Sequence, residues 1–378
     1  MEKRRMEKLG VETSLLGFGC MRFPTFEDGT IDREKTEKMI DAAYQAGVNY
    51  FDTAYAYHYG KSEEMIGKIL SKYDRNTYYL ATKMPMWLLK EESQVIAIFE
   101  EQLERLQTDH VDFYLLHSLN KENWEKAKQL HILEKCEEFK KQGKIKYLGF
   151  SFHDSYEVFE GILSSYHWDF CQIQYNYMDR EEQAGDRGYA LAEKLQVPMV
   201  IMEPVRGGRL ASFSKEINDM FYAMNPLASV ASYAMRWVAS HPNVKVVLSG
   251  MSTMEQVQDN LNTFCNFKPL SEAEEKRIED IVAVMRNRVQ NGCTGCQYCM
   301  PCPAGVDIPA CFRAWNEYHV YGSYEAVSYD WEQQIAEEAK PKNCIGCGKC
   351  ESVCPQHLSI REDLKRAQKE LEEASGKV

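Results

Sequence analysis

Short apolar runs alternate along the chain with longer segments in which apolar residues recur every three or four positions. The short runs have the length of β-strands, and the periodic segments are typical of amphipathic helices. Strands are predicted at 16–20, 48–52, 78–83, 111–116, 146–151, 170–175, 198–202 and 244–249. Helices are predicted at 32–46, 62–72, 93–106, 124–142, 155–164, 184–195, 226–239 and 253–264. This repeated strand–helix order predicts an α/β fold, a (β/α)8 TIM barrel rather than an open sheet.

Local signals refine the ends of these elements. Asp32 is a candidate N-cap for the first helix, and Gly47 lies just past its end. Ser62 is predicted to cap the second helix. The glycine-punctuated stretch 9–21 predicts a small hairpin that leads into the first barrel strand.

The strand–helix rhythm ends near Phe264, and a different pattern follows. Residues 271–291 are predicted to form one helix with an apolar face. Further helices are predicted at 308–318, 324–339 and 359–375. The predicted organisation is a barrel at 1–268, a connecting helix at 269–291 and a small, mainly helical domain at 292–378.

The charge balance limits the kinds of partner. The 378 residues include 45 Lys and Arg against 57 Asp and Glu, a net charge of −12. This acidity disfavours a nucleic-acid partner. No apolar run approaches the length of a membrane span, and residues 1–10 lack the apolar core of a signal peptide. We therefore expect a cytoplasmic protein with no membrane association.

Three successive predicted strands end in polar side chains that suit proton chemistry. Asp52, Lys83 and His117 follow apolar strands, and Tyr57 lies in the loop after Asp52. Catalytic residues of parallel barrels lie at the carboxyl ends of the strands. A phenol, with an ordinary pKa of ~10, is a poor proton donor unless a nearby cation makes its proton easier to lose. A lysine one strand away supplies such a cation.

The motifs around these residues resemble those of the aldo-keto reductases. The resemblance rests on GFGCMR, DTAYAY, ATK, LLH, GFSFH, QIQYN and GMSTMEQVQDNL. It implies an NAD(P)-dependent oxidoreductase that transfers hydride between a nicotinamide and a carbonyl or alcohol substrate. It also implies roles for the tetrad: Tyr57 as general acid, Lys83 lowering its pKa, Asp52 pairing with Lys83 and His117 orienting the carbonyl.

The resemblance further implies a set of cofactor contacts. Ser151 and Gln172 would hold the nicotinamide carboxamide, since they supply a donor and an acceptor. Met202 stands where many members of the family place an aromatic residue that stacks on the ring, so stacking would fall to a thioether.

The segment expected to bind the cofactor phosphates carries few cations. A helix that begins near Ser252 would offer free backbone N–H groups to a pyrophosphate. Gly250 and Gln256 are uncharged where members that prefer NADPH usually have Lys and Arg, which favours NADH and leaves NADPH open. Asp259 and Asn260 would hold the adenine, although Asn260 is equally well explained as a polar residue on the helix face. Arg206, and Arg209 after it, would compensate by gripping phosphate. The chain has no GxGxxG motif behind its first strand.

The cysteines are concentrated in the C-terminal part, where nine fall between Cys293 and Cys354. Cys344, Cys347, Cys350 and Cys354 follow the pattern C-x2-C-x2-C-x3-C-P, typical of bacterial ferredoxins, in which the fourth cysteine binds the other cluster. Cys293, Cys296, Cys299 and Cys302 form a similar run that is one residue shorter.

These two runs predict two 4Fe-4S clusters that exchange their fourth ligands. Cys293, Cys296, Cys299 and Cys354 would bind one cluster, and Cys302, Cys344, Cys347 and Cys350 the other. A four-cysteine zinc site remains the alternative, and disulfides do not suit the cytoplasm. Cys311 has no assigned role, and the spacing between the two runs resembles helical dicluster ferredoxins.

Three hypotheses for the function follow. The first is a carbonyl-reducing enzyme. The second is an electron-transfer enzyme whose clusters exchange electrons with an external redox protein. The third is a nicotinamide- or redox-sensing partner subunit with structural or regulatory clusters. Hydride carries two electrons, whereas each cluster takes one, and the chain shows no fingerprint of a flavin that would divide them. Three alternatives stay open: a bound flavin without such a fingerprint, a substrate radical, or clusters that are structural or regulatory.

Overall fold

The computed structural model describes residues 1–376 and separates into two compact units. The first unit comprises Met1–Gly207 and Ala231–Ser271. The second comprises Gly208–Val230 and the residues from Glu272 onward. The connection that leaves the barrel at Gly207 is therefore built into the second unit until the chain returns at Ala231.

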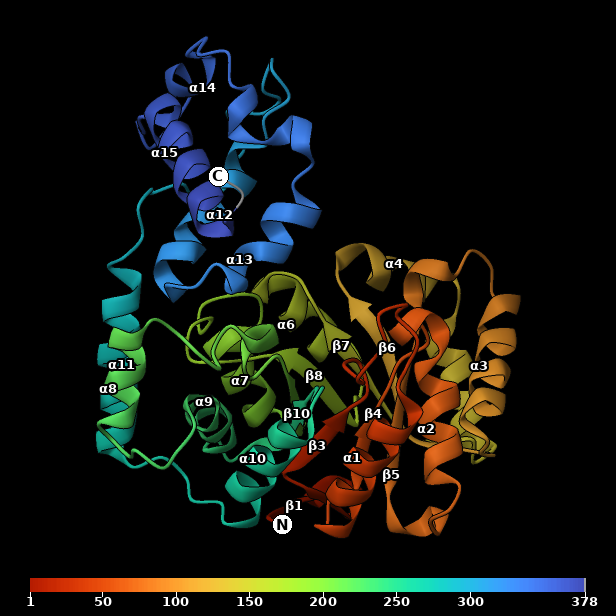
Figure 1. The fold of residues 1–378 in the computed structure, drawn as a ribbon. Helices are drawn as coiled ribbons and strands as arrows, with labels where there is room; N and C mark the ends of the chain where they lie inside the picture. Colours follow the sequence, from red (N-terminus) through yellow and green to blue (C-terminus); the bar gives the residue numbers. More distant parts are fainter. Residues whose placement is uncertain (377–378) are drawn as a thin grey trace. The chain divides into compact units, whose positions relative to one another are not determined.

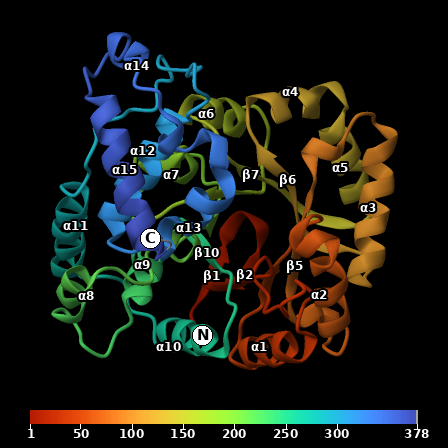
Figure 2. The same cartoon turned by 45° about the horizontal axis from the view of Figure 1, so that its top comes forward.

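The first unit is a closed barrel of parallel strands, as the sequence predicts. Consecutive strands pair in parallel, and β10 closes the ring by pairing with both β9 and β3. Helices surround the strands (Figures 1 and 2). The strands are β3 (Leu16–Gly19), β4 (Tyr50–Asp52), β5 (Tyr79–Met84), β6 (Val111–Leu119), β7 (Ile145–Phe152), β8 (Phe170–Gln174), β9 (Met199–Met202) and β10 (Val244–Ser249).

Most of the outer helices lie where the periodicity predicts them, with three corrections. The predicted helix 124–142 is two helices, because His131 adopts a left-handed conformation (φ 49°) and interrupts it. The helix predicted from 226 begins at Val230. Ser62 is not a cap. Its buried hydroxyl donates a hydrogen bond to the Cys20 carbonyl and also bonds with the Thr53 hydroxyl. The helices are α1 (Arg33–Gln45), α2 (Ser62–Leu70), α3 (Ser93–Leu106), α4 (Lys121–Gln129), α5 (Ile132–Lys141), α6 (Tyr156–Ser164), α7 (Gly185–Lys194), α9 (Val230–Ala239) and α10 (Met254–Cys265).

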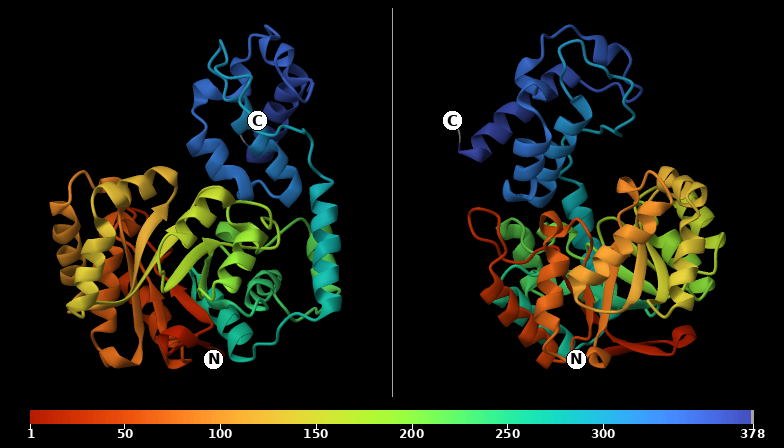
Figure 3. Two further views of the ribbon diagram at one scale, coloured as in Figure 1. Left: turned by 180° about the vertical axis from the view of Figure 1, so that it is seen from behind. Right: turned by 90° about the vertical axis from the view of Figure 1, so that its right-hand side faces the viewer.

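An N-terminal hairpin closes one end of the barrel (Figure 3). It consists of β1 (Lys3–Met6) and β2 (Val11–Ser14), so it begins earlier than the predicted stretch 9–21. Met6 and Val11 pack in the same buried cluster as Phe113 of the barrel interior. Burial of a side chain such as Phe113 stabilises the fold by ~1.5–3 kcal/mol. The far end of the barrel, where the strands finish, carries the predicted catalytic residues.

The second unit is mainly helical. Two predicted helices are shorter than expected: the one at 271–291 ends at Arg286, and the one at 324–339 gives way to a π-helical turn at Asp330–Gln334. The helices are α8 (Lys215–Tyr222), α11 (Glu272–Arg286), α12 (Ile308–Tyr321), α13 (Glu325–Tyr329), α14 (Lys349–Ser352) and α15 (Ile360–Ser375).

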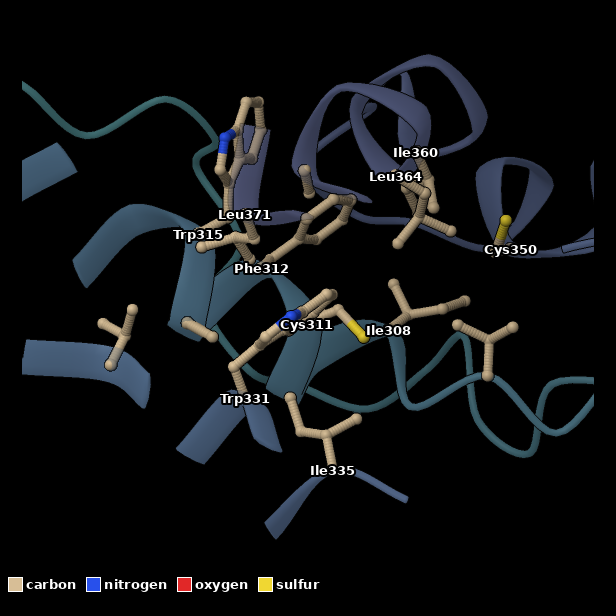
Figure 4. Close-up of a cluster of buried hydrophobic side chains, with 14 residues drawn as sticks. Ile308, Cys311, Phe312, Trp315, Trp331, Ile335, Cys350, Ile360, Leu364 and Leu371 are labelled. Carbon is tan, nitrogen blue, oxygen red and sulfur yellow. The ribbon is translucent and has the colours of Figure 1, made fainter. Parts of the chain in front are cut away.

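This unit has an apolar core of its own. Phe312 and Trp315 of α12 point toward Leu364 and Leu371 of α15, and Trp331 closes the cluster from the π-helical turn (Figure 4). Each of these side chains is almost fully buried. The fold of this unit is therefore supported by packed aromatic and aliphatic side chains around its cysteines.

None of the helices in the described part of the chain is both long and apolar enough to cross a membrane.

Candidate active site and cysteine cavities

A buried ion pair lies at the carboxyl ends of β4 and β5. Lys83 Nζ donates to Asp52 Oδ1 at 2.6 Å and to the Thr53 carbonyl at 2.8 Å. The exposed fractions of Lys83 and Asp52 are 0% and 2%. Burial lowers the pKa of Lys83, but the Asp52 carboxylate and the Tyr57 phenol more than offset it, so this pKa lies above its ordinary value. Lys83 is therefore a fixed, buried cation.

Tyr57 lies beside this cation, in the short 3-10 turn after β4. Lys83 Nζ is 5.2 Å from the centroid of the Tyr57 ring. Burial raises the pKa of Tyr57, and Lys83 opposes this without reversing it, so the pKa lies above its ordinary value. The lysine acts in the predicted direction, but burial dominates. At neutral pH, Tyr57 keeps the proton that it would donate.

The structure brings His117 to the same place from β6. Its ring stands nearly perpendicular to that of Tyr57, with centroids 6.1 Å apart, and Trp87 packs against it at 5.0 Å. Burial, followed by the positive charge of Lys83 and the nearby His153, holds the pKa of His117 well below its ordinary value. Among the described residues, its Nδ1 is buried without a hydrogen-bond partner. A neutral imidazole thus faces the phenol.

A polar network behind Lys83 is absent from the sequence-based prediction. The buried Glu63 carboxylate accepts hydrogen bonds from Thr82 Oγ1 (2.6 Å) and Gln102 Nε2 (2.8 Å), and it pairs with Arg105. Gln102 also donates to the Lys83 carbonyl at 2.9 Å. Glu63 and Gln102 belong to amphipathic helices, where a buried polar residue breaks the apolar stripe. That break is the signal by which they could have been found.

The predicted carboxamide pair lies side by side on β7 and β8. Ser151 and Gln172 are directly opposite in the strand register. The Ser118 backbone N–H donates to Ser151 Oγ at 2.7 Å, which leaves the hydroxyl proton available. Gln172 Nε2 contacts the Met202 sulfur at 3.5 Å, whereas Gln172 Oε1 is buried without a partner among the described residues. An amide N–H2 group would satisfy this oxygen, so the residues fit a nicotinamide carboxamide.

The loop and helix after β10 are arranged around internal hydrogen bonds. Thr253 caps α10, and Gln256 Oε1 accepts from the Ser252 backbone N–H at 2.7 Å. Asn260 Nδ2 donates to Ser249 Oγ at 2.9 Å and is buried. Asp259 is its partly exposed neighbour on α10. The side chains of Gln256 and Asn260, predicted to meet the cofactor, are thus engaged within the protein.

The two arginines predicted to compensate for missing cations also have acidic partners. Arg206 pairs with Asp179 at 3.1 Å. Arg209 lies in the second unit, where it pairs with Glu317 and Asp330.

Arg22 is a cation that the prediction missed, although it closes the GFGCMR motif. Its side chain lies over Gly250, because a Cβ placed there would be 2.8 Å from Arg22 Cγ. Its guanidinium lies near Gly207, because a Cβ built on that glycine would be 3.7 Å from Arg22 Nη2. Among the described residues, Arg22 has no acidic partner, and it is exposed. Arg22 therefore lies beside Gly250, although it comes from another loop.

In the second unit, the cysteines surround two cavities in the predicted groupings. One is lined by Cys293, Cys296, Cys299 and Cys354. The other is lined by Cys302, Cys344, Cys347 and Cys350, and Cys299 also borders it. Cys354 thus lines the cavity of the first run and Cys302 that of the second, and this donor set fits a cluster in each cavity.

Two further observations concern these cysteines. Cys311 is buried in the apolar core and lines neither cavity. Burial is the main cause that raises the pKa of its thiol, to about 12. In residues 1–376, no three His, Cys, Asp or Glu side chains are grouped closely enough to hold a single metal ion.

Comparison with known proteins identifies both parts of the chain. The family model for the aldo/keto reductase family matches residues 15–283, and that for the 4Fe-4S dicluster domain matches residues 292–358. The chain is 30% identical to the aldo-keto reductase YhdN of Bacillus subtilis (strain 168), over 68% of this chain and 87% of that protein. It is 24% identical to the NADH-specific methylglyoxal reductase of Escherichia coli (strain K12), over 68% and 89%.

The solved structures include the holo form of the aldo-keto reductase AKR11C1 from Bacillus halodurans. It superposes with a TM-score of 0.63 at 26% identity, and the match covers 74% of this chain and 96% of that one. The relatives account for the barrel, and the dicluster model accounts for the cysteine-rich segment. The chain therefore belongs to the aldo/keto reductase family, as an NAD(P)-dependent oxidoreductase that carries a 4Fe-4S dicluster domain.

Proposed function

We propose that the barrel reduces a small carbonyl substrate at the site formed by Asp52, Tyr57, Lys83 and His117. The observation that carries this proposal is the buried Asp52–Lys83 pair, whose cation lies 5.2 Å from the centroid of the Tyr57 ring. A reduced nicotinamide held by Ser151 and Gln172 would supply the hydride. Tyr57 supplies the proton to the carbonyl oxygen, and the charged Lys83 stabilises the phenolate that remains.

His117 and Asp52 prepare this proton transfer. A neutral imidazole next to Tyr57 donates a hydrogen bond to the carbonyl oxygen without competing for the proton, which fits its depressed pKa. Asp52 keeps Lys83 charged and fixed in a site that excludes water. Trp87, packed on His117 and partly exposed, forms an apolar wall for the substrate.

The cofactor would extend from β8 to the start of α10. Ser151 and the unpartnered Gln172 oxygen would hold the carboxamide, with Met202 against the ring. Arg22 would bind the pyrophosphate, because it lies exposed between Gly207 and Gly250. Gly250 and Gln256 carry no charge for a 2′-phosphate, so we propose a preference for NADH. A relative of this chain is named as an NADH-specific reductase, which supports the same choice.

The proposed activity is tested under anaerobic conditions with two probe aldehydes, methylglyoxal and benzaldehyde, and either NADH or NADPH. Methylglyoxal is chosen because one relative is named for it, and benzaldehyde because Trp87 offers an aromatic contact. We expect faster reduction with NADH than with NADPH. An NADPH preference above ~100-fold would overturn the proposed cofactor choice, since it corresponds to ~2.7 kcal/mol of selective binding.

Removal of the Arg22 guanidinium should weaken the binding of NADH and of NADPH to the same extent, because both cofactors contain the pyrophosphate. A hydrogen bond to a charged group contributes ~1.5–3 kcal/mol, so Arg22→Ala is expected to raise both dissociation constants by ~10- to 100-fold. Quenching of protein fluorescence by each cofactor measures this.

Arg187→Ala, which removes an exposed arginine that pairs with Glu157 on the outer helices, is the matched control. Its dissociation constants should equal those of the wild type. A loss confined to NADPH in Arg22→Ala would instead place this arginine at the 2′-phosphate, and unchanged binding of both cofactors would remove it from the site.

We further propose that each of the two cavities holds one 4Fe-4S cluster. These clusters would exchange electrons with an external redox protein. Cys296 and Cys347 are exposed, so each cluster would have an edge at the surface of its unit. Short distance to the surface favours electron exchange with a partner. We propose the cytoplasm as the location, because none of the thirteen cysteines forms a disulfide, as expected in a reducing compartment.

A further inference from the structure

The backbone that follows Tyr57 is in an unusual conformation. His58 (φ 50°), Tyr59 (φ 55°) and Gly60 (φ 86°) are all left-handed, and the first two are not glycine. A left-handed conformation costs a residue with a side chain roughly 1–2 kcal/mol. Two such residues directly after the proposed proton donor require other interactions to hold the turn.

His58 makes the contact that holds it. The Phe23 backbone N–H donates to His58 Nε2 at 3.0 Å. The His58 ring stacks on the Phe23 ring, with centroids 5.5 Å apart and planes inclined by 16°. Phe23 is itself buried against Phe18 of the first barrel strand. The side chain of His58 therefore connects the turn to the segment that follows β3.

The segment to which His58 is fastened has its own place at the site. It runs from Cys20 to Phe23 and includes Arg22, whose side chain lies over Gly250. The Cys20 backbone N–H also donates to the Asp52 carbonyl at 2.8 Å. One side-chain hydrogen bond thus joins the loop that carries Tyr57 to the loop that carries the free cation.

We infer that His58 is a positioning residue, whose neutral imidazole holds the left-handed turn so that Tyr57 stays beside Lys83 and His117. This inference rests on the proposed function of Tyr57 as proton donor. His58 itself touches neither Lys83 nor His117 in the hydrogen bonds and ring contacts of the described residues. His58 acts on Tyr57 through the backbone that joins the two residues.

The charge of His58 decides whether this hydrogen bond forms. A neutral imidazole has one nitrogen that accepts, whereas a protonated one has two donors and no acceptor. Burial, and then the positive charge of Arg22 that faces it, hold the pKa of His58 below its ordinary value. The contact is therefore intact at neutral pH and is lost as the pH falls through that lowered pKa, because the protonated ring repels the Phe23 N–H.

Two substitutions separate the hydrogen bond from the bulk of the ring. His58→Gln retains an acceptor that does not titrate, and glutamine already occupies left-handed positions in this chain at Gln107 and Gln196. His58→Leu retains apolar volume and has no acceptor. Tyr59→Asn is the matched control, since Tyr59 lies in the same turn with 96% of its surface exposed, and asparagine tolerates this conformation.

The experiment combines kinetics with hydrogen–deuterium exchange on the full-length protein. At pH 7.5, His58→Leu is expected to lower kcat for the better probe aldehyde by ~10- to 100-fold, with a small change in KM, because the proton donor is displaced. His58→Gln and Tyr59→Asn should stay within a few-fold of the wild type. As the pH falls through the lowered pKa of His58, kcat should decline in the wild type and in Tyr59→Asn, and this decline should be weaker in His58→Gln.

Exchange at the Phe23 amide, read by mass spectrometry of the peptide that contains it, reports the hydrogen bond directly and needs no turnover. It should be slow in the wild type and His58→Gln and faster in His58→Leu. Wild-type kcat and slow Phe23 exchange in His58→Leu would overturn the inference. If the wild type reduced neither aldehyde, the proposed function would fail, and the role given to His58 would fail with it even if exchange at Phe23 supported the hydrogen bond.

Discussion

Tyr57→Phe is expected to reduce carbonyl turnover by ~10²- to 10⁴-fold while cofactor binding stays almost unchanged, because only the proton donor is lost. The ring that packs against His117 and Lys83 remains in the variant. The effect should therefore fall on kcat. Steady-state rates with the better probe aldehyde, together with cofactor dissociation constants from fluorescence quenching, measure the two quantities separately.

Tyr55→Phe provides a matched control on the same loop. The Tyr55 hydroxyl donates to Glu101 at 2.9 Å, and its ring lies under the Arg105 guanidinium, away from the proposed chemistry. This variant should turn over at nearly the wild-type rate. Equal rates in Tyr57→Phe and the wild type would remove Tyr57 from the mechanism, and equal losses in both variants would indicate a general disturbance of the loop.

Cys354→Ala is expected to remove about four of about eight iron atoms per chain, by loss of the cluster whose other ligands precede it by some sixty residues. Cys354 lines the same cavity as Cys293, Cys296 and Cys299. Cys302→Ala should remove the other cluster, because Cys302 lines the cavity of the second cysteine run. The apolar core around Trp315 and Trp331 should keep the unit folded after one cluster is lost.

Iron and acid-labile sulfide analysis of anaerobically purified protein measures this outcome. Cys311→Ala is the control, since Cys311 is buried in the apolar core and lines neither cavity. It should retain about eight iron atoms, the content of two four-iron clusters. About four iron atoms in the wild type, or zinc in place of iron, would contradict the two-cluster proposal and the electron-transfer role with it.

The barrel could be predicted from the sequence because its strands are short apolar runs, and three successive ones carry a polar residue at or near their carboxyl ends. Asp52, Lys83 and His117 stand at such ends. Because neighbouring parallel strands end on the same side of a barrel, their proximity could be predicted from the strand pattern alone. The cysteine groupings follow from spacing in the same way. In each case, a local pattern determines which residues become neighbours.

The features that were missed depend on contacts between distant segments. The break at His131 has no glycine or proline to announce it. The Ser62 hydroxyl donates to the carbonyl of Cys20, forty-two positions earlier, and therefore does not cap the helix as predicted. Arg22 lies near Gly250 only because β10 closes the barrel against β3. The separation of 208–230 from the barrel likewise arises from packing in the second unit, including the pairing of Arg209 with Glu317.

The central claim, direct hydride transfer to a carbonyl carbon at the barrel site, is tested most directly by isotope transfer. The protein is incubated anaerobically with benzaldehyde and NADH that carries deuterium at both C4 positions, and the alcohol is analysed by mass spectrometry and NMR. Direct transfer predicts one deuterium on the carbinol carbon of each product molecule. Oxidation of the cofactor that yields alcohol without deuterium would contradict the account, because the electrons would then have reached the carbonyl by another route.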